Sequence, residues 1–301
     1  MRWRNSKQSY NVEDRRGQEP MQAGMGGMGL LRILPFLLRT KIGRIILIAG
    51  AAFYAFQYFT GGNMLQNGMP NTSSQAVGEA GAEGQNDESR QFVAAILGTT
   101  ETVWQQKLDG YQEPTLVLYN RMTQTGCGVG QAQTGPFYCP ADQKIYLDLS
   151  FMNELKKLGA PGDFAFAYVI AHEVGHHVQK LQGTSDQVHQ LQQQSSQADA
   201  NKLSVMLELQ ADCYAGIWGH EVNQQMDMLE PGDIDEGIQA ANAVGDDRLQ
   251  QMAGQAVHPD AFTHGSSEQR IAWFKRGFES GDMSQCDTFH NFVKPFYDAA
   301  R

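Results

Sequence analysis

Two histidines four residues apart follow an apolar run in the second half of the chain. Residues 164–170 read FAFAYVI, and residues 171–177 read AHEVGHH, which contains the pattern H-E-x-x-H. Residues i and i+4 share one face of a helix, so His172 and His176 can direct a ring nitrogen at the same metal ion. The pattern therefore predicts a buried helix that carries two ligands of a Zn²⁺ ion.

Glu173 follows the first histidine and would lie beside the open coordination position of the metal, where it can take a proton from water. A catalytic zinc ion needs three protein ligands and one exchangeable position. Metzincins supply the third ligand in the pattern H-E-x-x-H-x-x-G-x-x-H, but Gln179 and Gln182 occupy the glycine and final histidine positions here. The third ligand must come from another part of the chain.

A later helical segment offers two carboxylates with the same spacing. Glu208 and Asp212 lie four residues apart in the sequence ELQAD, among apolar residues that favour burial over a solvated helix face. We predict that Glu208 is the third zinc ligand. Asp212 would accept the second ring N–H of a ligand histidine and so fix its tautomer. The alternative is that these two residues exchange roles.

His264 lies just before a helix start that Ser266 and Gln269 mark as a capping box. From there it could donate a hydrogen bond that stabilises the oxyanion of a reaction, and a surface or capping histidine is the alternative. We interpret Arg270 as an ion-pair partner. The histidines interpreted as structural or exposed are His177, His189, His220, His258 and His290.

An uncharged apolar run predicts a membrane anchor near the N-terminus. Residues 45–59 read IILIAGAAFYAFQYF, and residues 42–60 approach the roughly 20 residues that span a bilayer. Arg39, Lys41 and Arg44 precede the run, so the positive-inside rule places the N-terminus in the cytoplasm and the remainder outside. The alternatives are a cleaved signal peptide and a buried helix of a soluble protein.

Secondary-structure signals after this region indicate a mostly helical α+β fold. We predict neighbouring strands at residues 114–119 and 144–149, in a small antiparallel sheet. The glutamine-rich residues 179–197 indicate a solvated hairpin or lid. Hydrophobic periodicity predicts helices at residues 92–110, 163–182, 199–222, 234–255 and 266–280.

The four cysteines form an even set, as expected of a domain in an oxidising compartment. Three disulfide connectivities are possible. Cys127 and Cys139 flank a Gly/Pro-containing segment and make the natural local pair, which leaves Cys213 with Cys286. Buried free thiols are the alternative.

The net charge of −10 conceals an asymmetry between the head of the chain and its body. Residues 1–60 carry nine Lys/Arg against three Asp/Glu, and the remainder carries 14 against 30. A nucleic-acid-binding surface needs basic residues that neutralise phosphates, so the acidic body excludes nucleic acid as a partner.

Together these motifs resemble the putative neutral zinc metallopeptidases of bacteria, single-pass anchored proteins with H-E-x-x-H followed by E-x-x-A-D. The resemblance covers nearly the whole chain. It includes NVEDRRG at residues 11–17, the apolar run, HEVGH at residues 172–176, ELQAD at residues 208–212 and THGSSEQR at residues 263–270. A more distant similarity to gluzincin peptidases of membranes implies a zincin-like fold.

We predict four regions in this chain. Residues 1–41 would be a basic cytoplasmic tail and membrane-approach segment, and residues 42–60 a single transmembrane helix in the inner membrane of a bacterium. Residues 61–89, rich in Gly, Asn, Ser and Gln, would be a flexible linker. Residues 90–301 would be a periplasmic zinc metallopeptidase domain with one Zn²⁺ per chain.

The predicted function is hydrolysis of peptide bonds by a zinc-activated water with Glu173 as general base, in an endopeptidase rather than an exopeptidase. The partners would be the bilayer and a peptide or protein substrate, which the strand at residues 144–149 could bind by strand addition. One alternative is a membrane-tethered binding or scaffold protein with a structural zinc, whose fourth ligand would be Cys213, His264 or another group. A zinc hydrolase that acts on a non-peptide amide is another.

Overall fold

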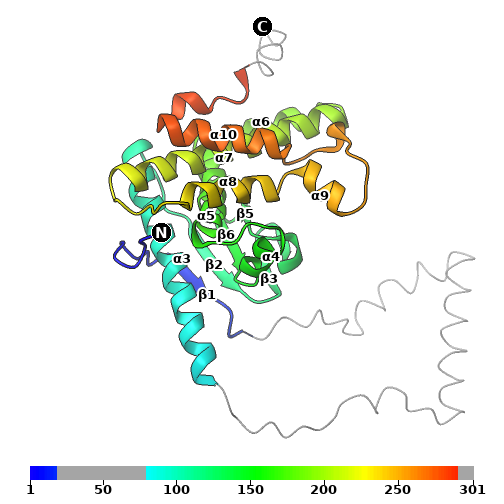
Figure 1. Cartoon of the computed structure of the whole chain (residues 1–301). Coiled ribbons are helices and arrows are strands. Elements are labelled where there is room, and N and C mark those ends of the chain that lie inside the picture. Colours follow the sequence, from blue (N-terminus) through cyan, green and yellow to red (C-terminus); the bar gives the residue numbers. More distant parts are fainter. Residues whose placement is uncertain (19–78, 291–301) are drawn as a thin grey trace, which may run out of the picture. The chain divides into compact units, whose positions relative to one another are not determined.

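The structure, a computed structural model, describes residues 1–18 and 79–290, with side chains from residue 88 onward in the second range (Figure 1). The predicted membrane anchor at residues 42–60 lies outside these ranges. Among the residues that are described, no helix has the length and apolar character needed to cross a bilayer. Helix α3 (Glu79–Lys107) begins inside the predicted linker, which therefore ends earlier than expected.

Helices make up most of the described chain, in agreement with the predicted α+β class. The segment with the H-E-x-x-H pattern is α5 (Asp163–Leu181), and the ELQAD segment belongs to α7 (Gln197–Gln224). Ser266 and Gln269 form the predicted capping box at the start of α10 (Ser267–Ser280). The other helices are α4 (Phe151–Lys157), α6 (Thr184–Gln193), α8 (Asp233–Ala243) and α9 (Asp246–Met252), with short 3-10 turns η1 (Ala132–Thr134), η2 (Pro259–Ala261) and η3 (Met283–Cys286).

The single helix predicted at residues 234–255 is wrong, because the chain forms two helices there. The break lies at Gly245, which is the N-cap of α9. A Cβ at this position would lie 2.4 Å from the backbone nitrogen of Ser267, so only glycine lets the chain pass so close to the start of α10. The contact between distant segments overrides the continuous helical pattern.

The predicted antiparallel sheet is mixed. Its strand order is β1 (Val12–Asp14), β2 (Thr115–Tyr119), β6 (Lys144–Asp148), β5 (Phe137–Cys139), and only the β5–β6 pair is antiparallel. The two predicted strands are β2 and β6, and they are neighbours as expected. They run parallel, not antiparallel, because the chain between them reverses its direction more than once. That intervening chain forms an antiparallel hairpin of β3 (Met122–Thr125) and β4 (Gly128–Gln131) and then β5.

Residues 1–18, which the prediction assigned to a tail of residues 1–41, belong to the same compact unit as the helices, and the remainder of that predicted tail lies outside the described residues. Strand β1 adds to the sheet beside β2. The buried ring of Trp3 packs edge-on against Phe92 of α3, with 5.3 Å between ring centroids. The chain at Lys7 lies so close to α3 that a Cβ on Gly98 would be 2.3 Å from its carbonyl oxygen.

The α-amino group of Met1 reaches the first turn of α5. It lies 3.1 Å from Asp163 Oδ1, 3.0 Å from Glu230 Oε2 and 3.4 Å from Asp233 Oδ1. Because residues 1–18 form one compact unit with residues 84–290, both must lie on the same side of any membrane. The prediction that one crossing at residues 42–60 separates the N-terminus from the catalytic domain does not fit these contacts.

Helix α5 lies between the sheet and the layer formed by α7, α8 and α10 (Figure 1). All but a few of its side chains are buried. Gly175 faces Ala211 of α7, and a Cβ added there would lie 3.1 Å from both the Cα and the carbonyl oxygen of Ala211. The glycine in HEVGH and the alanine in ELQAD therefore let the two motif helices approach closely.

Both predicted disulfides are present. Cys127 pairs with Cys139 and links the β3–β4 hairpin to β5, and Cys213 pairs with Cys286 and links α7 to η3. These bonds use all four cysteines of the chain.

Deletion of residues 1–18 should destabilise the folded protein, because it exposes one edge of β2 and the surface that Trp3 covers. Burial of one large apolar side chain is worth about 1.5–3 kcal/mol, so the loss of Trp3, Val12 and Met1 together should lower the free energy of unfolding by at least about 3 kcal/mol. Thermal and urea unfolding of the purified protein measure this. Tyr10→Ala is the control, since Tyr10 is 98% exposed, and unchanged stability of the deletion variant would contradict the packing of this segment.

Candidate metal centre

Two imidazole rings from α5 face one carboxylate from α7. Nε2 of His172 lies 3.2 Å from Glu208 Oε2, and Nε2 of His176 lies 3.4 Å from Glu208 Oε1. One ligand atom from each residue lies within 4.8 Å of the other two. The structure thus brings together the three predicted ligands, and two imidazole nitrogens with a carboxylate oxygen are a donor set that suits Zn²⁺.

Each of these histidines uses its other ring nitrogen in a hydrogen bond. Nδ1 of His172 lies 2.8 Å from Asp212 Oδ1, and Nδ1 of His176 lies 2.9 Å from Gln179 Oε1. Both partners are oxygen acceptors, so Nδ1 carries the proton and the lone pair of Nε2 is free for a metal. The rings are therefore fixed in the tautomer that a metal at Glu208 would need.

Asp212 is fully buried where α5, α7 and α10 meet. In addition to His172, it accepts hydrogen bonds from Tyr168 Oη at 2.5 Å and from Arg270 Nε and Nη2 at 2.8 and 2.9 Å. Its oxygens are thus engaged behind the ring of His172, whereas both oxygens of Glu208 face the Nε2 atoms. This geometry favours Glu208 over Asp212 as the ligand, and Arg270 is an ion-pair partner as predicted.

The electrostatic environment of the centre favours a positive charge between the rings. Burial alone would lower the pKa of His172, but the Asp212 carboxylate outweighs it and raises this pKa to about 10. At His176, burial would also lower the pKa, but the Glu208 carboxylate outweighs burial and raises it. At Glu208, burial would raise the pKa, but the two histidine rings hold it well below its usual value. Protons on the histidines supply this charge in the metal-free protein, and a divalent cation can replace them.

Glu173 lines a cleft of about 1580 Å³, together with the three predicted ligands. Its side chain is buried in the wall that α5 forms. Residues of strand β5 and of the loop before it also line the cleft, as do Leu249 of α9 and His264. The cleft is large enough for a peptide rather than for a small ion alone.

His264 lies in the wall of this cleft, and its side chain is 52% exposed. Asp246 organises its loop: Oδ2 accepts the backbone N–H groups of Thr263, His264 and Gly265 at 2.7, 2.6 and 3.1 Å, and Oδ1 lies 3.2 Å from His264 Nδ1. The hydrogen bond with Asp246 raises the pKa of His264. Its role as a donor to an oxyanion stays a prediction.

His177 is structural and supports the strand that borders the cleft. Its Nε2–H donates to the carbonyl of Gln112 at 2.6 Å, and its Nδ1 accepts the hydroxyl of Tyr138 in β5 at 3.1 Å. Burial lowers the pKa of this ring, which therefore stays neutral. Strand β5 is an outer strand of the sheet, whereas β6, at the predicted substrate-binding residues 144–149, lies between β2 and β5. Both edges of β6 are paired, so the hypothesis that a substrate adds to residues 144–149 does not fit this sheet.

Sequence reasoning missed four residues that support the centre. Tyr168 lies four residues before His172 and Gln179 three residues after His176, so helical spacing carried a signal for both. Gln210 and Asp246 stand on other elements and reach their partners only through the folded chain. Gln210 lies inside ELQAD but about 200° around the helix from Glu208, and Asp246 belongs to no motif, so spacing gives no comparable signal for either.

A family model described as a putative neutral zinc metallopeptidase matches residues 1–289 of this chain. The chain is 50% identical over 297 residues to YpfJ of Escherichia coli K12, described as an uncharacterized protein; the match covers 96% of this chain and 99% of YpfJ. It is 41% identical over 208 residues to the uncharacterized protein Rv2575 of Mycobacterium tuberculosis H37Rv. This match covers 65% of the present chain and 69% of Rv2575. No solved structure matches the chain.

Zinc binding should release protons at about pH 7, because the pKa of His172 in the metal-free protein is raised to about 10 and the metal binds the neutral ring. A lower pH keeps more protons on the rings, so the apparent affinity for Zn²⁺ should fall between about pH 8 and pH 6. Calorimetric titration in buffers of different ionisation enthalpy counts the protons released. An affinity that does not change over this range would contradict the assignment.

Proposed function

This chain belongs to the putative neutral zinc metallopeptidase family, and from that premise we propose that it is a zinc-dependent endopeptidase with its active site in the α5–α7 cleft. The observation that carries the proposal is the convergence of His172, His176 and Glu208 within 4.8 Å beside Glu173. The two imidazole nitrogens and the carboxylate oxygen suit one Zn²⁺ per chain, and the hydrogen bonds at Nδ1 hold both histidines in the tautomer that binds it.

When bound, a zinc ion would polarise a water molecule and a substrate carbonyl. Glu173 directly follows the ligand His172 and lines the cleft, so its carboxylate is the group that would take the proton from water and return it to the leaving amine. No covalent bond between enzyme and substrate is required.

His264 would donate a hydrogen bond to the oxyanion that develops on the substrate carbonyl. Asp246 supports this role, because it holds both the backbone and the ring of His264 at the cleft wall. The raised pKa of His264 keeps the ring a donor on both nitrogens over a wider pH range.

The substrate would lie extended along β5. This outer strand has a partner, β6, on one side, and it borders the cleft through Phe137 and Tyr138. An extended peptide can add to such a strand through main-chain hydrogen bonds, which do not depend on sequence. The bond between Tyr138 and His177 would hold this strand at a constant distance from α5.

The tethered binding protein with a structural zinc is less well supported. That function needs a closed coordination shell, for which Cys213 and His264 were the candidates. Cys213 forms a disulfide with Cys286 and has no thiolate to offer. Among the described residues, His264 does not belong to the cluster of ligand atoms that His172, His176 and Glu208 form. An intact glutamate at residue 173 also has no purpose in a structural site.

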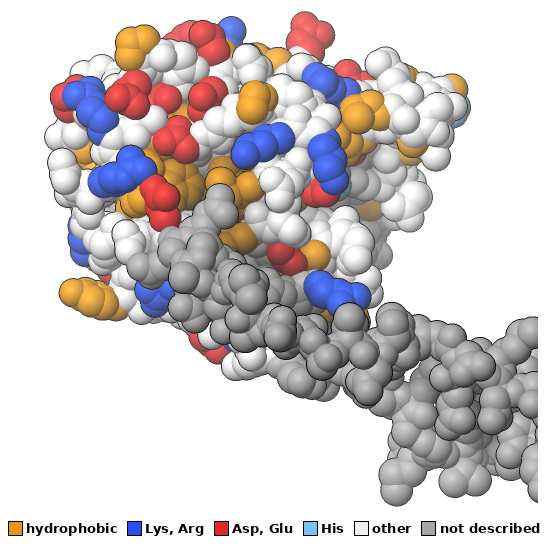
Figure 2. Space-filling model, turned by 60° about the horizontal axis from the view of Figure 1, so that its bottom comes forward, with side chains coloured by type: hydrophobic (Ala, Val, Ile, Leu, Met, Phe, Trp, Pro, Cys, Tyr) orange, Lys and Arg blue, Asp and Glu red, His pale blue; other side chains and the backbone are white. Residues whose placement is uncertain are grey.

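We also propose that residues 42–60 attach the protein to the bacterial inner membrane and that the catalytic unit lies on its outer, periplasmic side. The two disulfides support this side, since such bonds persist in oxidising compartments. The contacts of residues 1–18 add the condition that this segment lies on the same side as residues 79–290. Figure 2 shows acidic and basic side chains interspersed over one face, a distribution that does not resemble a surface for nucleic acid.

Glu173→Gln should abolish peptide cleavage and leave zinc binding intact, because the amide cannot accept a proton but preserves the shape of the side chain. The loss of a general base lowers the rate by about 10²–10⁴-fold. The assay uses the full-length, zinc-loaded chain and a pool of peptides blocked at both ends, so that only internal cleavage is detected. Mass spectrometry identifies the products.

Glu154→Gln is the matched control, because Glu154 lines the same cleft but is exposed and bonded to Lys157. It should cleave at the wild-type rate. Cleavage that persists in Glu173→Gln would contradict the role of Glu173. Absence of cleavage by the wild type, with one zinc bound per chain, would favour the binding-protein function.

Cysteines introduced at Tyr10 and at Glu279 should react in the same compartment, because the two parts of the chain pack together. All four native cysteines are paired, so each variant has one free thiol. The measurement is labelling of intact and of lysed spheroplasts with a membrane-impermeant maleimide. Labelling of only one of the two sites in intact spheroplasts would contradict the shared compartment.

A further inference from the structure

Gln179 is fully buried beside the candidate metal centre and makes three contacts there. Its Oε1 lies 2.9 Å from Nδ1 of His176, and its Nε2 donates to the carbonyl of Leu207 at 2.7 Å and to Oε1 of Gln210 at 3.1 Å. Leu207 directly precedes Glu208. One amide side chain thus joins a predicted ligand on α5 to the backbone beside another predicted ligand on α7.

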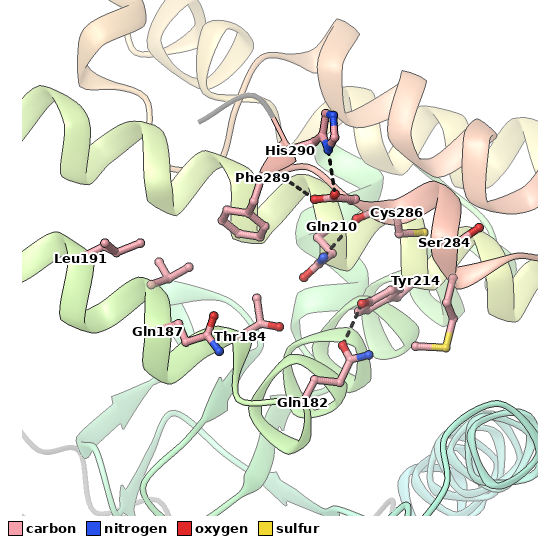
Figure 3. Close-up of a pocket in the computed structure, with 13 residues that line it drawn as sticks. Gln182, Thr184, Gln187, Leu191, Gln210, Tyr214, Ser284, Cys286, Phe289 and His290 are labelled. Atoms are coloured by element: carbon pink, nitrogen blue, oxygen red, sulfur yellow. Dashed lines mark hydrogen bonds and ion pairs between the residues drawn. The ribbon is translucent and has the colours of Figure 1, made fainter. Parts of the chain in front are cut away.

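Gln210 continues this chain of bonds toward the C-terminal part of the structure. It is 7% exposed, and its Nε2 donates to the carbonyl of Cys286 at 3.0 Å (Figure 3). Cys286 is bonded through its sulfur to Cys213, which lies on the same helix as Gln210. The far end of the chain of bonds is therefore attached covalently to α7.

The backbone carbonyl groups of Leu207 and Cys286 determine which group donates in each of these hydrogen bonds. A backbone carbonyl can only accept, so the NH₂ group of Gln210 must face Cys286 and the NH₂ group of Gln179 must face Leu207. The amide oxygens then point the opposite way. The oxygen of Gln210 accepts from Gln179, and the oxygen of Gln179 can only accept from Nδ1–H of His176.

We propose that Gln179 and Gln210 are positioning residues that hold His176 as its Nδ1–H tautomer and direct its Nε2 at the metal. The proposal rests on the proposed zinc site but does not depend on peptidase activity. It gives a function to the residue at which this sequence departs from the metzincin pattern. In that position a glutamine supplies an acceptor for His176 and a donor for α7 at once.

The neutral amide also distinguishes His176 from His172. Asp212 is a charged acceptor whose charge Arg270 balances, whereas no cation contacts Gln179 among the contacts described for it. A carboxylate at residue 179 would face the carbonyl of Leu207 and the amide oxygen of Gln210 without a donor for either. The amide satisfies all three neighbours, which explains why the second histidine has a neutral partner.

A nearby glutamine provides a matched control. Gln182 is the C-cap of α5. Together with Gln210 and Tyr214, it lines a cavity of about 650 Å³ between α6, α7 and η3. Figure 3 shows its side chain turned toward Tyr214, whose hydroxyl it accepts at 2.8 Å. It makes no described contact with either ligand histidine. The same substitution at residues 179 and 182 therefore separates the loss of a glutamine from the loss of the bond to His176.

The experiment measures Zn²⁺ affinity of the full-length chain by competition with a chromogenic chelator, and the visible spectrum of the Co²⁺ form. Loss of such a supporting bond lowers metal affinity by about 10–100-fold. We expect this loss for Gln179→Met, a smaller loss for Gln210→Met, and a change within about twofold for Gln182→Met. The double variant Gln179→Met/Gln210→Met should lose little more than Gln179→Met, because the two residues act in series.

Histidine nitrogen NMR spectra of the wild type test the tautomer directly, without any substitution. The proposal requires the proton of His176 on Nδ1, with Nε2 bound to the metal in the zinc form. In the zinc form, a His176 ring whose proton is on Nε2 and not on Nδ1 would overturn it, and so would wild-type zinc affinity and cobalt spectrum in Gln179→Met. A wild type that binds zinc with this tautomer but cleaves no peptide would refute the proposed activity and leave the positioning role intact.

Discussion

The arrangement of the central helices depends on one buried carboxylate, that of Asp212. A carboxylate without solvent is stable only where donors replace water, and removing one partner of a buried ion pair costs about 3–5 kcal/mol. Tyr168 and His172 donate from α5 and Arg270 from α10, whereas Asp212 belongs to α7. The donors that Asp212 needs therefore determine how three helices pack. One of those donors is also a predicted metal ligand, so the packing and the metal centre share the same requirement.

The features that the sequence predicts correctly are those with a local signal. H-E-x-x-H, ELQAD and the capping box at Ser266 each lie within one helix, where spacing alone decides which side chains share a face. The pairing of Cys127 with Cys139 follows from their proximity along the chain, and the second disulfide follows by exclusion. The family resemblance rests on the same local motifs and extends them to the whole chain.

The features that the sequence does not predict depend on contacts between distant segments. Strand β1 has three residues, too few for an alternating pattern, and its position is decided by the free edge of β2. The break at Gly245 is decided by its contact with Ser267 rather than by the helical pattern around it. In the sequence, Gln210 has no feature that distinguishes it from other helical glutamines. Its contacts with Gln179 and Cys286 form only in the folded chain.

Helix α5, which carries two of the predicted metal ligands, is held at both ends by groups that no motif marks. At its start, Glu236 accepts the backbone N–H of Phe164 at 3.0 Å, and the amino group of Met1 contacts Asp163. At its end, His177 and Gln179 bond to neighbouring segments. A displacement of the helix by one residue would turn its face by about 100° and carry both histidines away from Glu208. Residues 1–18 therefore support the candidate metal centre from the far end of α5, and a fragment that begins at residue 90 would lack part of that support.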